Sequence, residues 1–269
     1  MRRLAFVLLS SLSLAACAQP AAPQAQGGAK IAVSAPAAAP APAGEGEVEA
    51  RVRAVLRQLS DRIQVDSVRP APFPGFREVI AGGQVVYVSD DGKYLIQGNV
   101  LDIPRRRDLT EDAMGSVRAK VLAGIPMADR IVFSPAGTPK HRVVVLTDIE
   151  CGYCRKFHSE IAQHLANGIQ VEYLAFPRAG LGSEDYRKMV AVWCADDRRK
   201  ALTDAKNDRP VPMRTCKTPV DMEYRAGLQM GLTGTPMVLT EDGQLLGGYM
   251  PPAVLLQRLQ QLKQGAGRG

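Results

Sequence analysis

Apolar residues recur in two patterns along the first part of the chain, and these patterns predict its secondary structure. Apolar side chains at helical spacing, with charged residues between them, predict an amphipathic helix that begins near residue 47. Short apolar runs predict strands at residues 78–81, 84–89 and 94–100, the last two joined by a turn at Asp90-Asp91-Gly92. A unit of about 60 residues buries little apolar surface, so it is expected to associate with a second copy.

A different pattern begins after a helix predicted at residues 108–123, whose few large apolar residues suit a connector. A strand, a helix and a second strand are followed by a mostly helical stretch, a hairpin and a closing helix. This order of elements predicts an α/β layer structure. The predicted elements are strands at 143–146, 171–176, 237–240 and 245–249, a helix that opens at residue 151, the helical stretch 183–231 and the closing helix 252–263.

The first 17 residues are typical of a secretory signal. Arg2 and Arg3 precede an apolar stretch at residues 4–14, and small residues lead to Cys17. The four residues ending at Cys17, Leu-Ala-Ala-Cys, resemble a bacterial lipobox, in which that cysteine would be lipidated and tether the protein to a membrane. A cut after Ala18 would instead release an unanchored protein, and the sequence leaves both outcomes open.

The segment at residues 18–46 is rich in Ala and Pro, which cannot bury enough surface to fold, so it is predicted to be a tether. The rest of the 269-residue chain is globular in composition, and no charge-free apolar run is long enough to span a membrane. The formal net charge of +7 includes two arginines of the signal, and the basic run Arg105-Arg106-Arg107 is too short to predict nucleic-acid binding.

The sharpest chemical motif is Cys151-Gly152-Tyr153-Cys154, which follows a predicted buried strand and opens a helix. Unpaired N–H groups and the positive dipole end of a helix stabilise a thiolate, so Cys151 is expected to be nucleophilic near neutral pH. Cys154 lies one turn inside and is expected to be more buried. Their spacing allows a small disulfide ring, and Arg155, Lys156 and His158 add positive charge nearby.

Two further cysteines, Cys194 and Cys216, lie in the helical stretch. A structural disulfide between them is the favoured interpretation, and two free buried thiols are the alternative. A zinc site would need them together with Cys151 and Cys154, but their long separation gives no second close pair of ligands. No metal or cofactor is therefore predicted.

Thr235-Pro236 precedes the predicted strand at residues 237–240. Proline at the first residue of a strand is tolerated there and can be cis, so this dipeptide predicts either a cis-proline loop that faces the cysteines or an ordinary turn. His158 and His164 are six residues apart and do not share a helical face, so both are expected at the surface.

Five segments in order resemble the DsbC/DsbG family of bacterial periplasmic disulfide isomerases, and the likeness covers residues 47–263. The segments are 88–93 (VSDDGK), 146–154 (LTDIECGYC), 173–178 (YLAFPR), 193–195 (WCA) and 234–236 (GTP). The resemblance implies an N-terminal α+β, cystatin-like dimerisation domain at 47–106, a linker helix at 107–126 and a thioredoxin-like domain with a helical insertion at 127–264. It also implies a V-shaped homodimer with chaperone activity and a structural Cys194–Cys216 disulfide.

The resemblance further implies that Cys151 attacks wrong disulfides in misfolded exported proteins and that Cys154 or a substrate thiol resolves the mixed disulfide. Thr235 and Pro236 would position the substrate chain, next to Gly152 and Tyr153. A membrane reductant of the DsbD type would keep the pair reduced.

This sequence departs from the pattern of related proteins at two positions that affect the chemistry of the cysteines. Many thioredoxins have a buried acid six residues before the first cysteine, where this chain has Val145, so proton transfer to Cys154 must use another group or water. Glu150 immediately precedes Cys151 and should oppose thiolate formation. The alternatives are a DsbA-like thiol oxidase, a DsbG-like reductant, which usually carries Pro in place of Gly152, and a non-enzymatic chaperone or binding module.

Overall fold

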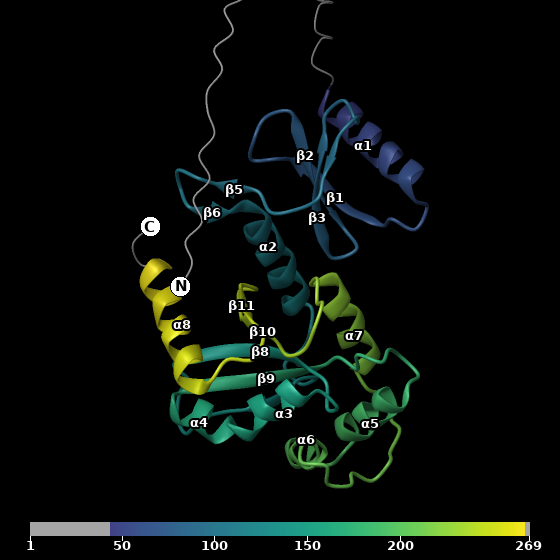
Figure 1. Cartoon of the computed structure of the whole chain (residues 1–269). Helices are drawn as coiled ribbons and strands as arrows, with labels where there is room; N and C mark the ends of the chain where they lie inside the picture. The colour runs from purple at the N-terminus through teal and green to yellow at the C-terminus, as the bar shows by residue number, and fades with distance from the viewer. Residues whose placement is uncertain (1–43, 267–269) are drawn as a thin grey trace, which may run out of the picture. The chain divides into compact units, whose positions relative to one another are not determined.

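The computed structural model describes residues 44–266, which form two separate main sheets with helices packed on them (Figure 1). The predicted signal, Cys17 and the tether as far as residue 43 lie outside the described residues, so those predictions remain predictions. No helix within 44–266 is long and apolar enough to cross a membrane.

The N-terminal sheet has four antiparallel strands in the order β1-β2-β3-β4. Helix α1 (Glu45–Leu59) buries Val48, Val52 and Leu56 at helical spacing against Val79 of the sheet. This is the amphipathic helix that the sequence predicts. The strands are β1 (Val65–Pro70), β2 (Phe76–Ala81), β3 (Gln84–Ser89) and β4 (Leu95–Ile96).

Two predictions for this sheet need correction. Strand β1 was not predicted, because its polar residues and Pro70 hide the alternation, yet it pairs with β2 along its whole length. The strand predicted at residues 94–100 pairs with β3 only at Leu95 and Ile96. The chain then turns at Gly98, whose φ of 151° favours glycine, and enters a small ladder formed by β5 (Leu101–Asp102) and β6 (Arg107–Asp108).

Helix α2 (Leu109–Ala123) occupies the predicted connector position. The Asp108 carboxylate caps it by accepting a hydrogen bond from the Glu111 N–H, which satisfies one of the free donors of the first turn. Ala113 and Met114 pack with residues of β2 and β3, whereas Leu122 packs with residues of the second sheet.

The second sheet has five strands in the order β11-β10-β8-β9-β7. Strands β8 (His141–Thr147) and β9 (Ile169–Ala175) are parallel and pair over seven residues, and the other neighbours are antiparallel. The remaining strands are β7 (Ile131–Phe133), β10 (Met237–Thr240) and β11 (Leu245–Gly247). Strand β7 was not predicted, because its three residues are too few to show a period.

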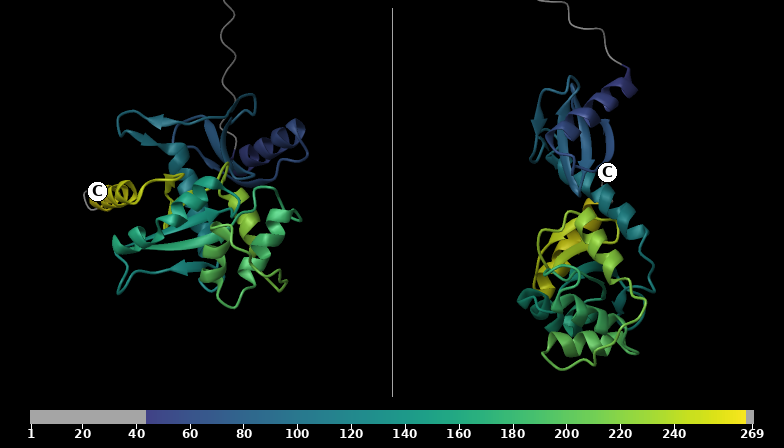
Figure 2. Two further views of the ribbon diagram at one scale, coloured as in Figure 1. Left: turned by 60° about the horizontal axis from the view of Figure 1, so that its bottom comes forward. Right: turned by 90° about the vertical axis from the view of Figure 1, so that its right-hand side faces the viewer.

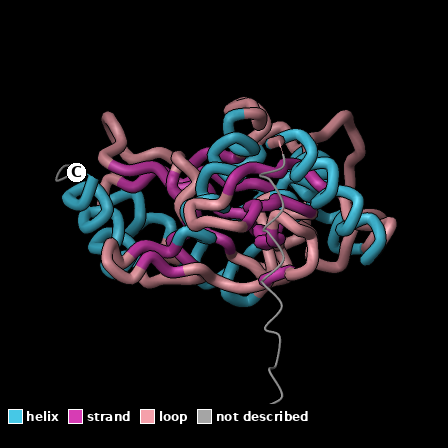
Figure 3. The backbone as a smooth tube through the Cα atoms, turned by 90° about the horizontal axis from the view of Figure 1, so that it is seen from above, coloured by secondary structure: helices cyan, strands magenta, loops and turns pink. Residues whose placement is uncertain are grey.

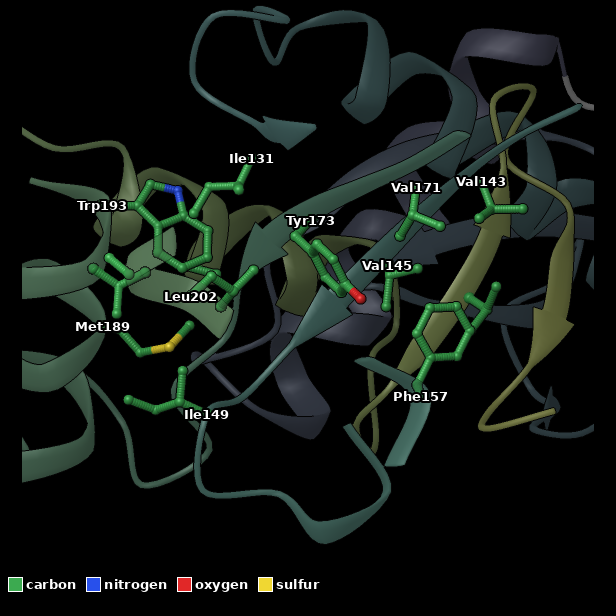
Figure 4. Packing of buried hydrophobic residues seen from close by; sticks show 14 of the residues in the cluster. Ile131, Val143, Val145, Ile149, Phe157, Val171, Tyr173, Met189, Trp193 and Leu202 are labelled. Atoms are coloured by element: carbon green, nitrogen blue, oxygen red, sulfur yellow. The ribbon is translucent and has the colours of Figure 1, made fainter. Parts of the chain in front are cut away.

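Helices cover both faces of this sheet (Figures 2 and 3). On one face, side chains of β8 and β9 such as Val145 and Tyr173 pack with Phe157, Met189 and Leu202 (Figure 4). On the other face, Val144, Leu146 and Leu174 of the same two strands pack against α7 and the end of α2. The helices after β8 are α3 (Gly152–Ser159), α4 (Ile161–Ala166), α5 (Glu184–Trp193), α6 (Arg198–Lys206), α7 (Val220–Gln229) and α8 (Pro252–Ala266).

Candidate active site

Cys151 lies at the carboxyl end of β8, where it is the N-cap residue of α3. The loop between them is held by Asp148, whose carboxylate accepts a hydrogen bond from the Glu150 N–H at 2.7 Å and one from Arg178 Nε at 2.8 Å. The backbone N–H of Cys154 hydrogen-bonds to the Cys151 sulfur. The local fold therefore places this thiol against free N–H groups at the positive end of a helix.

The second predicted motif lies against the first. The Thr235–Pro236 peptide bond is cis, and Cys151 Sγ donates a hydrogen bond to the Thr235 carbonyl oxygen at 3.2 Å, across 84 residues of sequence. Both cysteines of the motif are free thiols in the structure, with Cys151 4% exposed and Cys154 1% exposed. The outer thiol is thus the one that a substrate can reach beside the cis-proline loop.

The surroundings of Cys151 lower the pKa of its thiol. Burial opposes ionisation, but hydrogen bonds from the Thr235 side chain and from Cys154, together with the charge of Arg178, outweigh it. The bond from the thiol to the Thr235 carbonyl favours the protonated form, whereas the Thr235 hydroxyl has no other partner among the described residues and is free to donate to the thiolate. For Cys154, burial raises the pKa, which keeps that thiol protonated at neutral pH.

Glu150 is neutralised by neighbouring cations, so its charge opposes thiolate formation less than the sequence predicts. Its carboxylate forms ion pairs with Arg155 at 3.0 Å and with Lys188 at 2.9 Å. Arg155 is itself shared with Asp208. The positive charge expected from Arg155 is therefore engaged in surface ion pairs.

The prediction that His158 and His164 lie at the surface is wrong, since both are buried. Helix α3 ends at Ser159 and α4 begins at Ile161, and this break changes the helical phase so that both rings face inward. Burial, followed by the charge of Lys206, lowers the pKa of His158 to about 3, and burial lowers that of His164 to about 4. His158 is therefore neutral and adds no positive charge to the site.

An apolar groove runs beside the thiol, lined by Tyr153, the segment 233–237 and the segment 247–249. Tyr153 is 66% exposed and its ring stacks on Tyr249 with the centroids 5.9 Å apart. Gly152 has open space where a side chain would lie, so the approach to Cys151 is unobstructed on that side. Sequence reasoning missed Tyr249, because an aromatic residue after a short strand carries no specific signal.

Cys194 and Cys216 form a disulfide that joins the end of α5 to the segment before α7. These two sulfurs are bonded to each other and so are not zinc ligands, which removes the tetracysteine alternative. Within residues 44–266, no group of three His, Cys, Asp or Glu side chains is placed to hold a metal ion.

Two buried ionisable side chains near the cysteines carried no signal in the sequence. Lys206 ends α6 and donates hydrogen bonds to Thr147 and Asp148 at the end of β8. Asp185 lies near Asp148, and burial, followed by that negative charge, raises its pKa to about 7. They belong to α6 and α5, far from the cysteines in sequence, so only the fold reveals that they pack against the end of β8 and the loop that follows it.

Known proteins resemble the chain over both of its sheets. A family model described as the disulfide bond isomerase protein N-terminal domain matches residues 17–111, and one described as a thioredoxin-like domain matches residues 132–263. These two matches confirm the predicted fold class.

Two curated relatives have the same name, thiol:disulfide interchange protein DsbC. The one from Escherichia coli strain K12 is 38% identical over 190 residues, covering 71% of this chain and 79% of the relative. The one from Haemophilus influenzae is 36% identical over 200 residues, covering 73% and 84%. A solved structure of a disulfide interchange protein from Neisseria gonorrhoeae is 28% identical with a TM-score of 0.45, covering 51% of this chain and 99% of that one.

Proposed function

Because the chain belongs to the DsbC family of thiol:disulfide interchange proteins, we propose that Cys151 and Cys154 are its redox-active pair and that Cys151 is the nucleophile. The observation that carries this proposal is the position of the Cys151 sulfur, which caps α3 and lies 3.2 Å from the Thr235 carbonyl beside the cis bond to Pro236. A thiol with a lowered pKa at a helix N-terminus is a reactive nucleophile. The activity is protein disulfide isomerisation.

In the first step the Cys151 thiolate attacks one sulfur of an incorrect disulfide in an exported protein. A Cys151–substrate S–S bond forms, the old bond breaks, and the second substrate sulfur leaves as a thiolate that takes a proton from water. A substrate thiolate then attacks the mixed disulfide and frees Cys151, which rearranges the substrate with no net oxidation. If Cys154 attacks instead, the substrate leaves reduced and the enzyme holds a Cys151–Cys154 disulfide.

An oxidised enzyme must be reduced again, and we assign that step to a membrane reductant of the DsbD type in the periplasm. No cofactor is needed, since thiol–disulfide exchange moves electrons directly between sulfur atoms. The exposed Tyr153 supports a role in contacting the client chain, and the free space at Gly152 leaves room for that chain next to Cys151. The Thr235 backbone would pair with an extended client segment, positioned by Pro236.

The partners extend to a second copy of the chain. Apolar side chains are exposed along the edge of the N-terminal sheet and the ladder that follows it. A second copy of the chain that covers this edge would explain why apolar side chains lie there. They are Tyr94, Leu95, Ile96, Leu101 and Ile103. We assign dimerisation to the domain that begins with α1 at Glu45 and ends near residue 106, the linker to 107–126 and catalysis to 127–264. The residues between Cys17 and α1 would form the tether, with Cys17 as its lipid-bearing end.

The proposal is tested by trapping the mixed disulfide. With Cys154→Ser the resolving thiol is absent, so incubation with a scrambled protein should yield a covalent adduct that reductant releases and whose cross-linked peptide contains Cys151. The matched variant Cys151→Ser, which keeps the inner thiol, should give no adduct. An adduct formed equally by both variants would contradict the assignment of the nucleophile.

A further inference from the structure

A buried cation lies behind the cysteine pair. Lys206 is 4% exposed, and its Nζ donates hydrogen bonds to Thr147 Oγ1 at 2.7 Å and to the Asp148 carbonyl oxygen at 3.0 Å. Among residues 44–266 no carboxylate lies within ion-pair distance of this amine. An ammonium group without a carboxylate partner is costly in a protein interior, and its presence here calls for a reason other than stability.

The amine connects to the inner thiol through one hydroxyl group. Thr147 Oγ1, which accepts the bond from Lys206, also lies next to the Cys154 sulfur, where its hydroxyl stabilises the thiolate. The two end groups also interact through their charges, since the Lys206 ammonium favours the Cys154 thiolate and the thiolate favours the ammonium. The Thr147 hydroxyl therefore connects the Lys206 amine to the Cys154 thiol.

No acidic side chain provides this path in the way a buried carboxylate does in many thioredoxins. The corresponding position is Val145, which is fully buried and packs in the apolar core (Figure 4). The residue after Thr147, Asp148, carries a carboxylate, but this group is engaged by Arg178 at 2.8 Å. Proton transfer to and from Cys154 thus has to use a different group.

Two side chains of α3 beside this path are already paired or neutral. Arg155 is paired with Glu150 and Asp208, and burial keeps His158 neutral. Burial of Lys206 likewise lowers the pKa of its amine to about 8, which brings its uncharged form within reach near neutral pH. The charged and titratable groups that interact with this path are Cys151, Arg155 and His158 of α3 and its cap, Asp148 and Arg178 from the loops after β8 and β9, and Tyr173 of β9. Asp185 of α5 lies next to Asp148.

Building on the proposed redox pair, we propose that Lys206 is a positioning residue that, through the Thr147 hydroxyl, takes the proton of Cys154 when that thiol resolves a mixed disulfide. The thiol proton passes to Thr147 Oγ1 while the hydroxyl proton passes to the Lys206 amine. The resulting Cys154 thiolate attacks Cys151 Sγ, the Cys151–Cys154 bond forms, and the substrate sulfur leaves as a thiolate. When a reductant opens that disulfide, the Lys206 ammonium returns the proton to Cys154.

Glutathione disulfide is the probe, because it separates the two chemical steps. The fully reduced chain first forms a Cys151–glutathione mixed disulfide and releases one glutathione, and Cys154 then displaces the second. Acid quenching followed by alkylation and intact-mass analysis measures both rates across the neutral pH range. Lys206→Met should slow the second step about tenfold near pH 7 and move its pH midpoint upward, while the first step changes less than about twofold.

Two further variants complete the test. Thr147→Val, which keeps the shape but removes the hydroxyl, should slow the second step in the same way. Lys200→Met, on the exposed side of the same helix, should leave both steps unchanged. A Lys206→Met chain whose second step keeps the wild-type rate and pH midpoint would overturn the proposal. Failure of the wild-type chain to form the Cys151 adduct would overturn the redox assignment and this proposal together.

Discussion

Replacing Cys151 with Ala should lower disulfide isomerase activity by at least about a thousandfold, to the level of the glutathione buffer alone. The reason is that this thiol is the proposed nucleophile, which would form the mixed disulfide, and the other cysteine sulfurs of the described chain cannot take its place. Cys154 is 1% exposed with a raised pKa, and the other two described cysteines are bonded to each other. The measurement is the initial rate at which a scrambled multi-disulfide protein regains activity.

The matched control for this variant is Cys154→Ala. It keeps the nucleophile and should retain part of the isomerase activity, since a substrate thiol can resolve the mixed disulfide, while net reduction of substrate is lost. If Cys151→Ala instead rescued the scrambled protein as well as the wild type does, the activity would belong to a chaperone that does not use its thiols.

Removing the structural disulfide should have the largest effect on stability. Cys194 and Cys216 are 22 residues apart in sequence, and closing a loop of this length constrains the unfolded chain by about 3 kcal/mol. Thermal unfolding of the second sheet domain should therefore shift down by roughly 10 °C when both residues become Ala.

The comparison for the disulfide is best made in a chain whose Cys151 and Cys154 are already Ala, so that the redox state of the active pair does not contribute. In that background, the chain with Cys194 and Cys216 and the chain without them differ only in the bond of interest. Equal unfolding temperatures for the two chains would show that this bond does not stabilise the domain.

The placement of the candidate site was predictable from the sequence where a local pattern marks each of its parts. The strand before the cysteines, the helix after them and the proline loop each carry a local signal, and the structure places Cys151 and Thr235 in contact. Strand β1 was missed because its polar residues hide the alternation, and β7 because three residues are too few to show a period. Their strand geometry comes from pairing with β2 and β9. Tertiary pairing overrides weak local preference.

The buried polar groups were the least predictable part of the site. His158 and His164 are on the surface if one continuous helix is assumed, and the break between α3 and α4 reverses that conclusion. Lys206 looks like an ordinary solvated lysine at the end of a helix, since only the packing of α6 against the end of β8 buries its amine. Such contacts join residues 59 positions apart, which single-sequence periodicity does not report.

Reactivation of two forms of one multi-disulfide protein, scrambled and fully reduced, by the wild-type chain in a glutathione buffer distinguishes an isomerase from an oxidase. A disulfide isomerase whose active pair is kept reduced should accelerate recovery of the scrambled form, which requires bonds to be broken and remade. Recovery of the reduced form alone, with no effect on the scrambled form, would contradict this account and identify a thiol oxidase.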